Sequence, residues 1–413
     1  MKRIQSLYLF DPEVNAGKMI FLSGPRQVGK TTFVKNRLKE TGDEELYFNW
    51  DDPYVRREYA KNPHFLKSYL ARTKNKFPLI AFDEIHKHKN WKNILKGLYD
   101  IHSEEAQFII TGSARLDYFR QSGDSLVGRY FSYRLLPIGL AEASGNFDLV
   151  LNDDIMLAQP DKQNLLRTIQ KMNEKTFKES FNRLMTYGGF PEPFIKTKMS
   201  FSNKWRRDYK SLLIHEDLRD LTRIQDIKGI EQLLLLLPER IASPLSINSL
   251  KDDLQVNHKT VSNWLEALKK IYLVFSIMPW SKSISKAIKK ETKFYFFDWT
   301  MAKDEGAKFE NAIAVFLLRL VCRWNELGLG DFDIRYIRNQ QGQEVDFVIV
   351  KGQKPLALFE AKRGDIDMSK SGAYFNKLLK IPYYQLVLDH DIVEAYPDNK
   401  YIISAWRFLS LLG

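Results

Sequence analysis

Short apolar segments alternate with helix-like segments over about the first 145 residues. Five segments have the length and apolar character of buried strands: Met19 to Ser23, Glu45 to Trp50, Leu79 to Phe82, Gln107 to Thr111 and Tyr130 to Leu135. Apolar runs with few polar interruptions are typical of strands covered on both faces. The rhythm predicts an α/β domain over 1–145, in which a parallel sheet carries helices on both faces.

The pattern changes after this domain. From Leu165 to about Ser243 the spacing is helical and no convincing strand occurs, so we expect a helical connector or lid over 146–243. Two short helices followed by aromatic-rich strands are expected over 244–303. A further α/β domain is expected over 304–413 from an apolar helix and three strand-like runs, Ile334 to Arg338, Glu344 to Val350 and Leu356 to Glu360.

The strand that begins at Met19 runs into a glycine-rich loop and then into a helical pattern. The loop consists of Gly24, Pro25, Arg26, Gln27, Val28, Gly29, Lys30, Thr31 and Thr32, and it has the spacing of a phosphate-binding loop. Its glycines let backbone N–H groups face the phosphates, while Lys30 reaches the β and γ oxygens and Thr31 binds Mg²⁺. We expect ATP and Mg²⁺ here, because a plain glycine-rich turn does not require this strand, loop and helix order.

Two acidic residues, Asp83 and Glu84, follow the apolar strand that begins at Leu79. Ligands of parallel sheets bind at this edge of the strands. Asp83 is therefore expected to hold Mg²⁺ through water, and Glu84 to act as the general base of ATP hydrolysis. His86 and His88 come next, but a third metal ligand is missing nearby, so a solvated loop is the preferred interpretation.

A further apolar strand, Phe108 to Ile110, ends in Thr111 and Ser113, whose hydroxyls are placed to orient the attacking water. Its position after the acidic pair suggests an extra strand between the phosphate loop and that pair. Together with Gly128-Arg129 and Leu136-Pro137, these motifs resemble those of AAA+-type P-loop ATPases of bacteria and archaea that carry a C-terminal domain of unknown function.

The resemblance covers most of the chain, including a Gly-Gly-Phe-Pro segment at 188–191 and late Glu-Val-Asp and Glu-Ala-Lys motifs. It implies that Thr111 or Ser113 acts as the γ-phosphate sensor. It also implies that Arg129 is a candidate arginine finger, the alternative being a solvated or salt-bridged arginine.

Residues 246–270 have helix-turn-helix spacing, with Ser246 and Asn257 as N-caps. The second helix has an apolar face (Val261, Trp264, Leu265 and Leu268) and leaves polar residues outward (His258, Lys259, Ser262, Asn263 and Lys270). Ser281 to Lys293 contains five lysines and one glutamate, so the whole region resembles a winged helix. DNA phosphates would be contacted by Lys259, Lys282, Lys286, Lys289 and Lys290; docking of a protein partner is the alternative.

Four residues near the end of the chain have the types and order of a metal-dependent nuclease. Glu310 lies on the apolar helix, Asp346 lies in a strand, and Glu360 and Lys362 share one face of the next strand. The arrangement resembles the restriction-endonuclease-like PD-(D/E)xK fold, in which the carboxylates hold Mg²⁺ or Mn²⁺ and the lysine assists the nucleophile. The fold does not by itself establish cleavage, and Gly342-Gln343-Glu344 precedes Asp346 where that family is expected to have a Pro-Asp.

The composition indicates a cellular compartment and a class of binding partner. The net charge of +12 favours polyanions such as DNA, although a basic excess can also serve solubility alone. The single cysteine, Cys322, is expected to be a buried helix residue in a reducing compartment. No run is long enough to span a bilayer, so we expect a cytoplasmic protein without a membrane partner.

Three hypotheses follow for function. The first is an ATPase whose nucleotide state controls a C-terminal half that binds DNA or a partner. The second is an ATP-regulated, metal-dependent nuclease acting in defence or repair, and the third is an ATP switch that binds protein only. A second copy of the chain is a further expected partner if Arg129 acts in trans.

Overall fold

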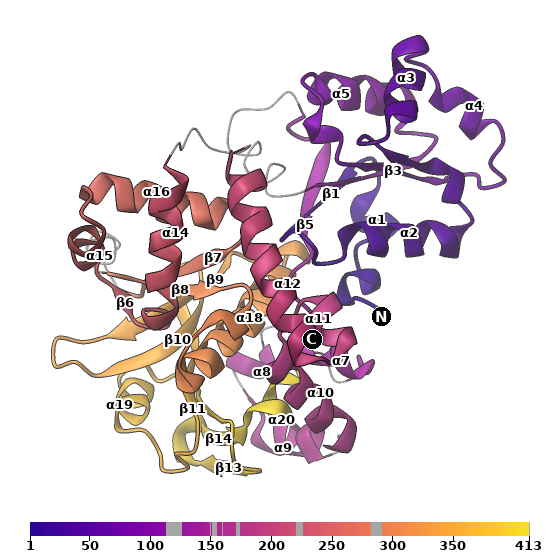
Figure 1. Ribbon diagram of the computed structural model, residues 1–413. Helices are drawn as coiled ribbons and strands as arrows, with labels where there is room; N and C mark the ends of the chain where they lie inside the picture. The colour runs from indigo at the N-terminus through magenta and orange to yellow at the C-terminus, as the bar shows by residue number, and fades with distance from the viewer. Residues whose placement is uncertain are drawn as a thin grey trace. The chain divides into compact units, whose positions relative to one another are not determined.

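The computed structural model describes residues 1–112, 126–148, 150, 155–158, 160–170, 174–219, 226–281 and 291–412. The chain forms two compact units (Figure 1). The first comprises Gln5–Leu136 with Lys270–Tyr272, and the second comprises Met1–Ile4, Pro137–Lys269 and Leu273–Gly413. The first unit covers most of the predicted segment 1–145, whereas nearly all of the predicted segments 146–243, 244–303 and 304–413 falls within the second unit.

A five-stranded parallel sheet, ordered β2-β3-β4-β1-β5, forms the centre of the first unit. Its strands are β1 Met19–Ser23, β2 Tyr47–Asn49, β3 Leu79–Asp83, β4 Gln107–Thr111 and β5 Tyr130–Arg134. All five coincide with predicted strands. Strand β4 lies between β1 and β3, which confirms the extra strand expected between the phosphate loop and the acidic pair.

Helices pack on this sheet because its strands are apolar on both faces. They are α1 Pro12–Asn15, α2 Lys30–Thr41, α3 Pro53–Lys61, α4 Leu66–Leu70, α5 Trp91–His102 and the short 3₁₀ helices Glu44–Leu46 and Ile85–Lys87. Phe21, Phe82 and Phe108 pack on one face with Trp91 and Leu98 of α5. Alternate residues face the other side, and α2 also contacts β3 and β4. The sheet thus holds the start of α2 at the carboxyl ends of its strands.

The first part of the second unit is helical, as predicted. Its helices are α7 Leu140–Ser144, α8 Ile155–Ala158, α9 Lys162–Gln170, α10 Glu174–Tyr187, α11 Pro191–Lys196, α12 Met199–Leu212, the π-helix Leu213–Leu218, α14 Ile227–Leu236 and the 3₁₀ helix Leu237–Glu239. Glu142 of α7 is fully buried and lies 3.1 Å from both Arg3 and Arg319. Burial tends to raise its pKa, but the two guanidinium groups outweigh this and lower it, so Glu142 stays charged.

A nine-stranded mixed sheet, ordered β13-β14-β12-β11-β10-β9-β7-β8-β6, unites the rest of the second unit (Figure 1). The strands are β6 Pro244–Leu245, β7 Val274–Pro279, β8 Thr292–Phe296, β9 Phe332–Arg338, β10 Glu344–Lys351, β11 Lys354–Lys362, β12 Tyr383–Val387, β13 Val393–Tyr396 and β14 Lys400–Ser404. Its helices are α15 Ile247–Leu254, α16 His258–Lys270, α18 Glu305–Glu326, α19 Lys370–Leu379 and α20 Ala405–Leu409.

One strand pairing explains why the predicted boundary near residue 303 does not separate two units. Strand β7 pairs with β8 on one side and with β9 on the other, where Met278 lies opposite Arg335. The helix-turn-helix segment and the C-terminal segment therefore share one continuous sheet. A sequence pattern reports the strands but not which of them are neighbours.

The two helices expected over 246–270 are present as α15 and α16, each with its predicted N-cap residue. Ser246 accepts a hydrogen bond from the N–H of Ser249 (3.4 Å), and Asn257 accepts one from that of Thr260 (2.8 Å). The predicted apolar face of α16 is buried, with Trp264 packed over Gly229 of α14. Cys322 lies on α18 as expected, but it is only half-buried.

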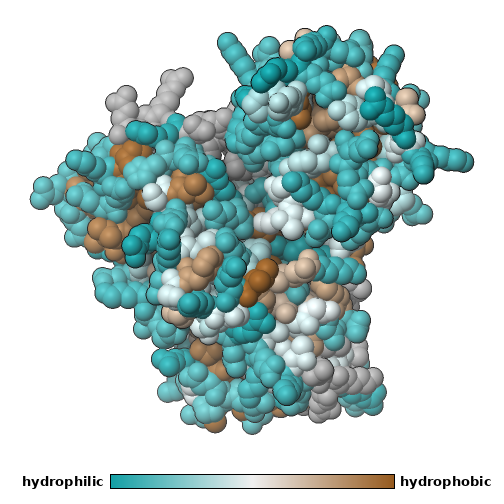
Figure 2. Space-filling view, turned by 45° about the vertical axis from the view of Figure 1, so that its right-hand side comes forward, coloured by the Kyte–Doolittle hydropathy of each residue, from teal (hydrophilic) through white to brown (hydrophobic). Residues whose placement is uncertain are grey.

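The exposed surface carries mostly polar side chains. Figure 2 shows one face, on which hydrophobic residues form small separate patches in a hydrophilic surround. Among the described residues, no helix is long and apolar enough to cross a membrane.

Candidate functional site

The phosphate loop joins the end of β1 to the start of α2 in a curled backbone. Gly24 has φ +141°, and a Cβ atom there would lie 2.1 Å from the carbonyl oxygen of Leu135. Gly29 caps α2 with φ +98°. Both positions need glycine, the first because β5 approaches so closely and the second because its backbone is left-handed. The first turn of α2 contains no acidic residue, so its N–H groups favour an anion.

Lys30 is buried inside this loop. Its ammonium donates hydrogen bonds to the carbonyl oxygens of Gly24 (2.9 Å) and Pro25 (2.7 Å). The lysine therefore holds the loop around its own positive charge, where a phosphate oxygen can replace the carbonyls as acceptor. The other predicted residues of the loop and of the start of α2 are Arg26, Gln27, Val28, Thr31 and Thr32.

Asp83, at the end of β3, is held by three hydroxyl groups. Thr31 and Tyr47 donate to its Oδ2 at 2.7 and 2.6 Å, and Thr111 donates to its Oδ1. Thr31 and Asp83 therefore lie side by side, as the sequence predicted. A hydroxyl and a carboxylate in contact form a suitable oxygen donor set for Mg²⁺. Ser113, the alternative sensor, lies outside the described residues.

Tyr47 is a site residue that the sequence analysis missed. It lies at the start of β2, and burial together with its hydrogen bond to Asp83 raises the pKa of its hydroxyl. Lys35 lies over its ring, 4.5 Å from the centroid. Tyr47 thus fixes the orientation of the Asp83 carboxylate without standing near it in sequence.

We expect Tyr47→Phe to lower the rate of ATP hydrolysis about tenfold at limiting Mg²⁺. Hydrogen bonds to charged groups contribute about 1.5–3 kcal/mol, and without this one the Asp83 carboxylate turns more freely. The ring keeps its packing, so the fold should persist. Hydrolysis measured against Mg²⁺ concentration tests this, with Tyr69→Phe as control because Tyr69 bonds to Glu58 elsewhere in the same unit. Equal rates for both variants would contradict the role.

Glu84 follows Asp83 in a left-handed backbone conformation, with φ +59°. Its N–H donates to the carbonyl of Thr111 (3.0 Å), which fixes it beside the end of β4. Its Oε2 lies 3.2 Å from Lys87 and 3.6 Å from His86. Burial raises the pKa of Glu84, and Lys87 opposes part of that rise. A carboxylate of raised basicity suits a general base.

The interpretation of His86 and His88 as parts of a solvated loop is wrong for His86. Its side chain is buried because the 3₁₀ turn Ile85–Lys87 folds it back against Glu84, while His88 is half-buried near Trp50. His86 therefore belongs to the surroundings of the predicted base.

Arg129 lies at the amino ends of the strands, whereas the phosphate loop lies at their carboxyl ends. Its carbonyl accepts a hydrogen bond from Met19, which opens β1, whereas the loop follows Ser23 at the other end. Its guanidinium forms an ion pair with Asp100 of α5 (2.9 Å). Four strand residues separate the two ends by about 13 Å, so Arg129 does not reach the phosphate loop of its own chain.

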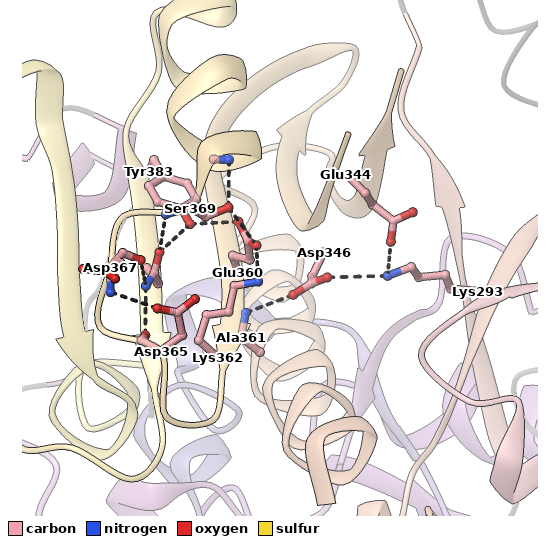
Figure 3. Close-up of polar contacts among 12 residues, drawn as sticks. Lys293, Glu344, Asp346, Glu360, Ala361, Lys362, Asp365, Asp367, Ser369 and Tyr383 are labelled. Carbon is pink, nitrogen blue, oxygen red and sulfur yellow. Dashed lines mark hydrogen bonds and ion pairs between the residues drawn. The ribbon is translucent and has the colours of Figure 1, made fainter. Parts of the chain in front are cut away.

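In the second unit, the four predicted nuclease residues fall into two polar groups, and Figure 3 shows Asp346 of the first group and Glu360 and Lys362 of the second. In one, the ammonium of Lys293 lies 3.1 Å from Glu310, 2.7 Å from Glu344 and 3.6 Å from Asp346. In the other, Glu360 accepts from Ser369 (3.0 Å) and Tyr383 (2.8 Å) and pairs with Lys362 (2.7 Å).

The two groups meet on β11, where the N–H of Ala361 donates to Oδ2 of Asp346 (3.0 Å). The predicted metal ligands Glu310 and Asp346 thus share a contact with Lys293. The third, Glu360, contacts Ser369, Tyr383 and Lys362 instead. Within the described part of the chain, no three His, Cys, Asp or Glu side chains are placed to hold one metal ion. The sequence also missed Lys293 and Glu344.

Of the five predicted DNA-contacting lysines, only Lys259 lies within the described residues, and it is exposed on α16. Lys282, Lys286, Lys289 and Lys290 lie outside them. His258 and Asn263 are exposed on the same helix, as predicted. The outer face of α16 thus has the polar surface that a groove-binding helix needs.

A comparison with known protein families finds a match that lies mostly within the first unit. A family model described as an AAA domain matches residues 16–144. Those residues are therefore similar to an AAA domain, and their five-stranded parallel sheet with helices is consistent with the α/β fold of P-loop ATPases. A second model, described as a domain of unknown function (DUF8612), matches residues 178–304 and leaves the role of that segment open.

Two proteins of similar sequence are each named an uncharacterized protein. Protein Rv2008c of Mycobacterium tuberculosis is 25% identical over 356 residues, which cover 84% of this chain and 70% of that protein. Protein MJ1637 of Methanocaldococcus jannaschii is 26% identical over 297 residues, covering 68% and 60%. A chain from the "Structure of Drosophila ORC bound to DNA" aligns with 70% of this chain and 89% of its own length at 11% identity, but its TM-score of 0.27 is too low to support an argument.

Proposed function

We propose that the chain binds and hydrolyses Mg-ATP, and that its nucleotide state controls a C-terminal half that binds DNA. The observation that carries the first part is the meeting of Lys30, Thr31, Asp83 and Glu84 at one edge of the parallel sheet. Mg-ATP would supply the phosphoryl group, with the metal neutralising charge on the phosphate oxygens. The protein's own residues bind, orient and accept a proton.

Each side chain has a separate task in this proposal. Lys30 and the N–H groups at the start of α2 bind the phosphates, and Thr31 with Asp83 holds Mg²⁺. The carboxylate of Glu84 takes a proton from the attacking water. Thr111 already contacts Asp83, so its hydroxyl is placed to sense what Asp83 binds. These roles are supported by the contacts around Asp83 and Glu84.

The DNA-binding part is supported by the order of elements around α16. Helix α14, strand β6, helices α15 and α16, and the antiparallel pair β7 and β8 follow one another as in a winged helix, with β6 pairing β8. In that fold the second helix of the turn enters the DNA groove. Docking of a protein partner on the same face is the alternative, in which case the chain is an ATP switch that touches no DNA.

DNA cleavage has weaker support. Asp346 and Glu360 with Lys362 lie on neighbouring strands, which suits a PD-(D/E)xK nuclease, yet each carboxylate already contacts a lysine. Plasmid cleavage in Mg²⁺ or Mn²⁺ that is lost in Lys362→Ala would support this candidate. Its absence would leave the domain as a binding module.

The proposed function is tested by ATP hydrolysis and DNA binding in one preparation. We expect DNA to change the hydrolysis rate and duplex binding to weaken steeply with salt, because lysines release counterions from phosphates. Lys259→Ala should lower the salt slope by about one. Lys377→Ala, at an exposed lysine of α19, serves as the control. Hydrolysis without any DNA binding would favour the protein-binding switch, and no hydrolysis would refute the ATPase.

A further inference from the structure

A buried lysine stands at the centre of the acidic side chains of the second unit. Lys293, on β8, is only 1% exposed. We call Glu310, Glu344 and Asp346 the acidic cluster; they come from α18 and β10, and all three carboxylates contact the Lys293 ammonium at 2.7–3.6 Å. Figure 3 shows Lys293 pointing toward Glu344 and Asp346. A buried ammonium persists only where such partners stabilise it.

The carboxylates of the acidic cluster keep the side chain of Lys293 protonated. Burial alone would lower the pKa of Lys293, but Glu310, Asp346 and Glu344 outweigh it and raise that pKa. The ammonium already neutralises the carboxylates that it contacts, so less negative charge remains for a second cation.

The oxygen atoms of these carboxylates are also committed to other donors. The Tyr295 hydroxyl donates to the same Oε1 of Glu310 that Lys293 contacts (2.8 Å). The N–H of Ala361 donates a hydrogen bond to Oδ2 of Asp346. Glu360, the third ligand expected from the sequence, is occupied by Ser369, Tyr383 and Lys362. Mg²⁺ needs several oxygens at about 2.0–2.1 Å in octahedral geometry, and this donor set does not fit it.

We propose that the ammonium of Lys293 is the resident cation of the acidic cluster, and that it excludes divalent metal ions from Glu310, Glu344 and Asp346. Clustered carboxylates require a cation, and here the chain supplies its own. The second unit then keeps a nuclease-like arrangement of residues as a structural element. This inference concerns the second unit alone and does not depend on ATP hydrolysis.

The test is Mn²⁺ binding to the full-length chain without nucleotide, followed by the electron paramagnetic resonance signal of free Mn²⁺. The parent chain should show no site that depends on Asp346. Lys293→Met should gain one site, at least about tenfold tighter than anything in the parent, because metal affinity follows the number of available ligands. Adding Asp346→Asn should remove the gained site. The phosphate loop is the same in all variants, so its contribution cancels.

Lys303→Met is the matched control, since Lys303 is an exposed lysine of the same unit that pairs only with Glu239 among the described residues. It should behave as the parent does. If Lys293→Met does not fold, Lys293→Gln retains a donor, and its thermal unfolding midpoint should rise with Mn²⁺ while that of the parent does not.

Two results would overturn the proposal. One is a Mn²⁺ site in the parent that disappears in Asp346→Asn, which needs no variant of Lys293. The other is a folded Lys293 variant that gains no Mn²⁺ site and no Mn²⁺-dependent stability, which would mean that the lysine is not what excludes the metal.

Discussion

Lys30→Ala is expected to lose measurable ATP binding and hydrolysis. The structure places the Lys30 ammonium against the loop carbonyls of Gly24 and Pro25, and removing such charge stabilisation typically costs about 10² to 10⁵ in the rate of phosphoryl transfer. The change should leave α2 intact, since the helix contacts β3 and β4 and buries Phe33, Val34 and Leu38. Binding of a fluorescent ATP analogue and phosphate release measure the two losses.

Glu84→Gln should separate binding from hydrolysis in the same assays. Glutamine has the same size but cannot accept the proton, so ATP should bind normally while turnover falls at least about a hundredfold. In the parent, the raised pKa of Glu84 means that the base is protonated, and activity lost, at a higher pH than for an ordinary glutamate. Lys39→Ala and Glu40→Gln, at exposed residues of α2, are the controls. Parent-like turnover in both Lys30→Ala and Glu84→Gln would falsify the site.

The parts of the candidate ATPase site that are contiguous in the sequence were predictable from it. The loop from Gly24 to Thr32 is contiguous, and Asp83 with Glu84 directly follows an apolar strand. The buried parallel strands β1, β3 and β4 are apolar along nearly their whole length, so they were visible as runs. The edge strands β2 and β5 are only partly buried and were recognised by their aromatic residues. Tyr47 had no such signal of a role in the site. Its hydroxyl meets Asp83 only because β2 pairs with β3 in the register that sets Tyr47 opposite Ala81.

The second unit was less predictable because its contacts are long-range. Lys293 occurs in a lysine-rich stretch that suggests a solvated wing, and its burial depends on carboxylates from α18 and β10. Strands β12, β13 and β14 were not predicted, although Tyr383–Val387 and Lys400–Ser404 are apolar runs like those of the first sheet. The rule that clustered carboxylates need a cation was sound, but it did not say which cation.

The position of Arg129 in the sheet decides which nucleotide this residue could contact. The strand β1 separates it from the phosphate loop of its own chain, so a catalytic role requires the nucleotide of a second copy. An arginine supplied in trans typically contributes about 10³ to 10⁵ in rate. The alternative is the structural role suggested by its ion pair with Asp100.

If Arg129 acts in trans, Arg129→Ala should lose about 10³-fold or more in turnover. Mixing it with Lys30→Ala should restore part of the activity, because the first variant keeps an intact phosphate loop and the second keeps Arg129. The specific activity of the parent should also rise with protein concentration. Asp100→Ala is the matched control: it removes the ion pair but not the arginine, and should stay active. An inactive mixture, with parent activity independent of concentration and Asp100→Ala as impaired as Arg129→Ala, would assign Arg129 the structural role.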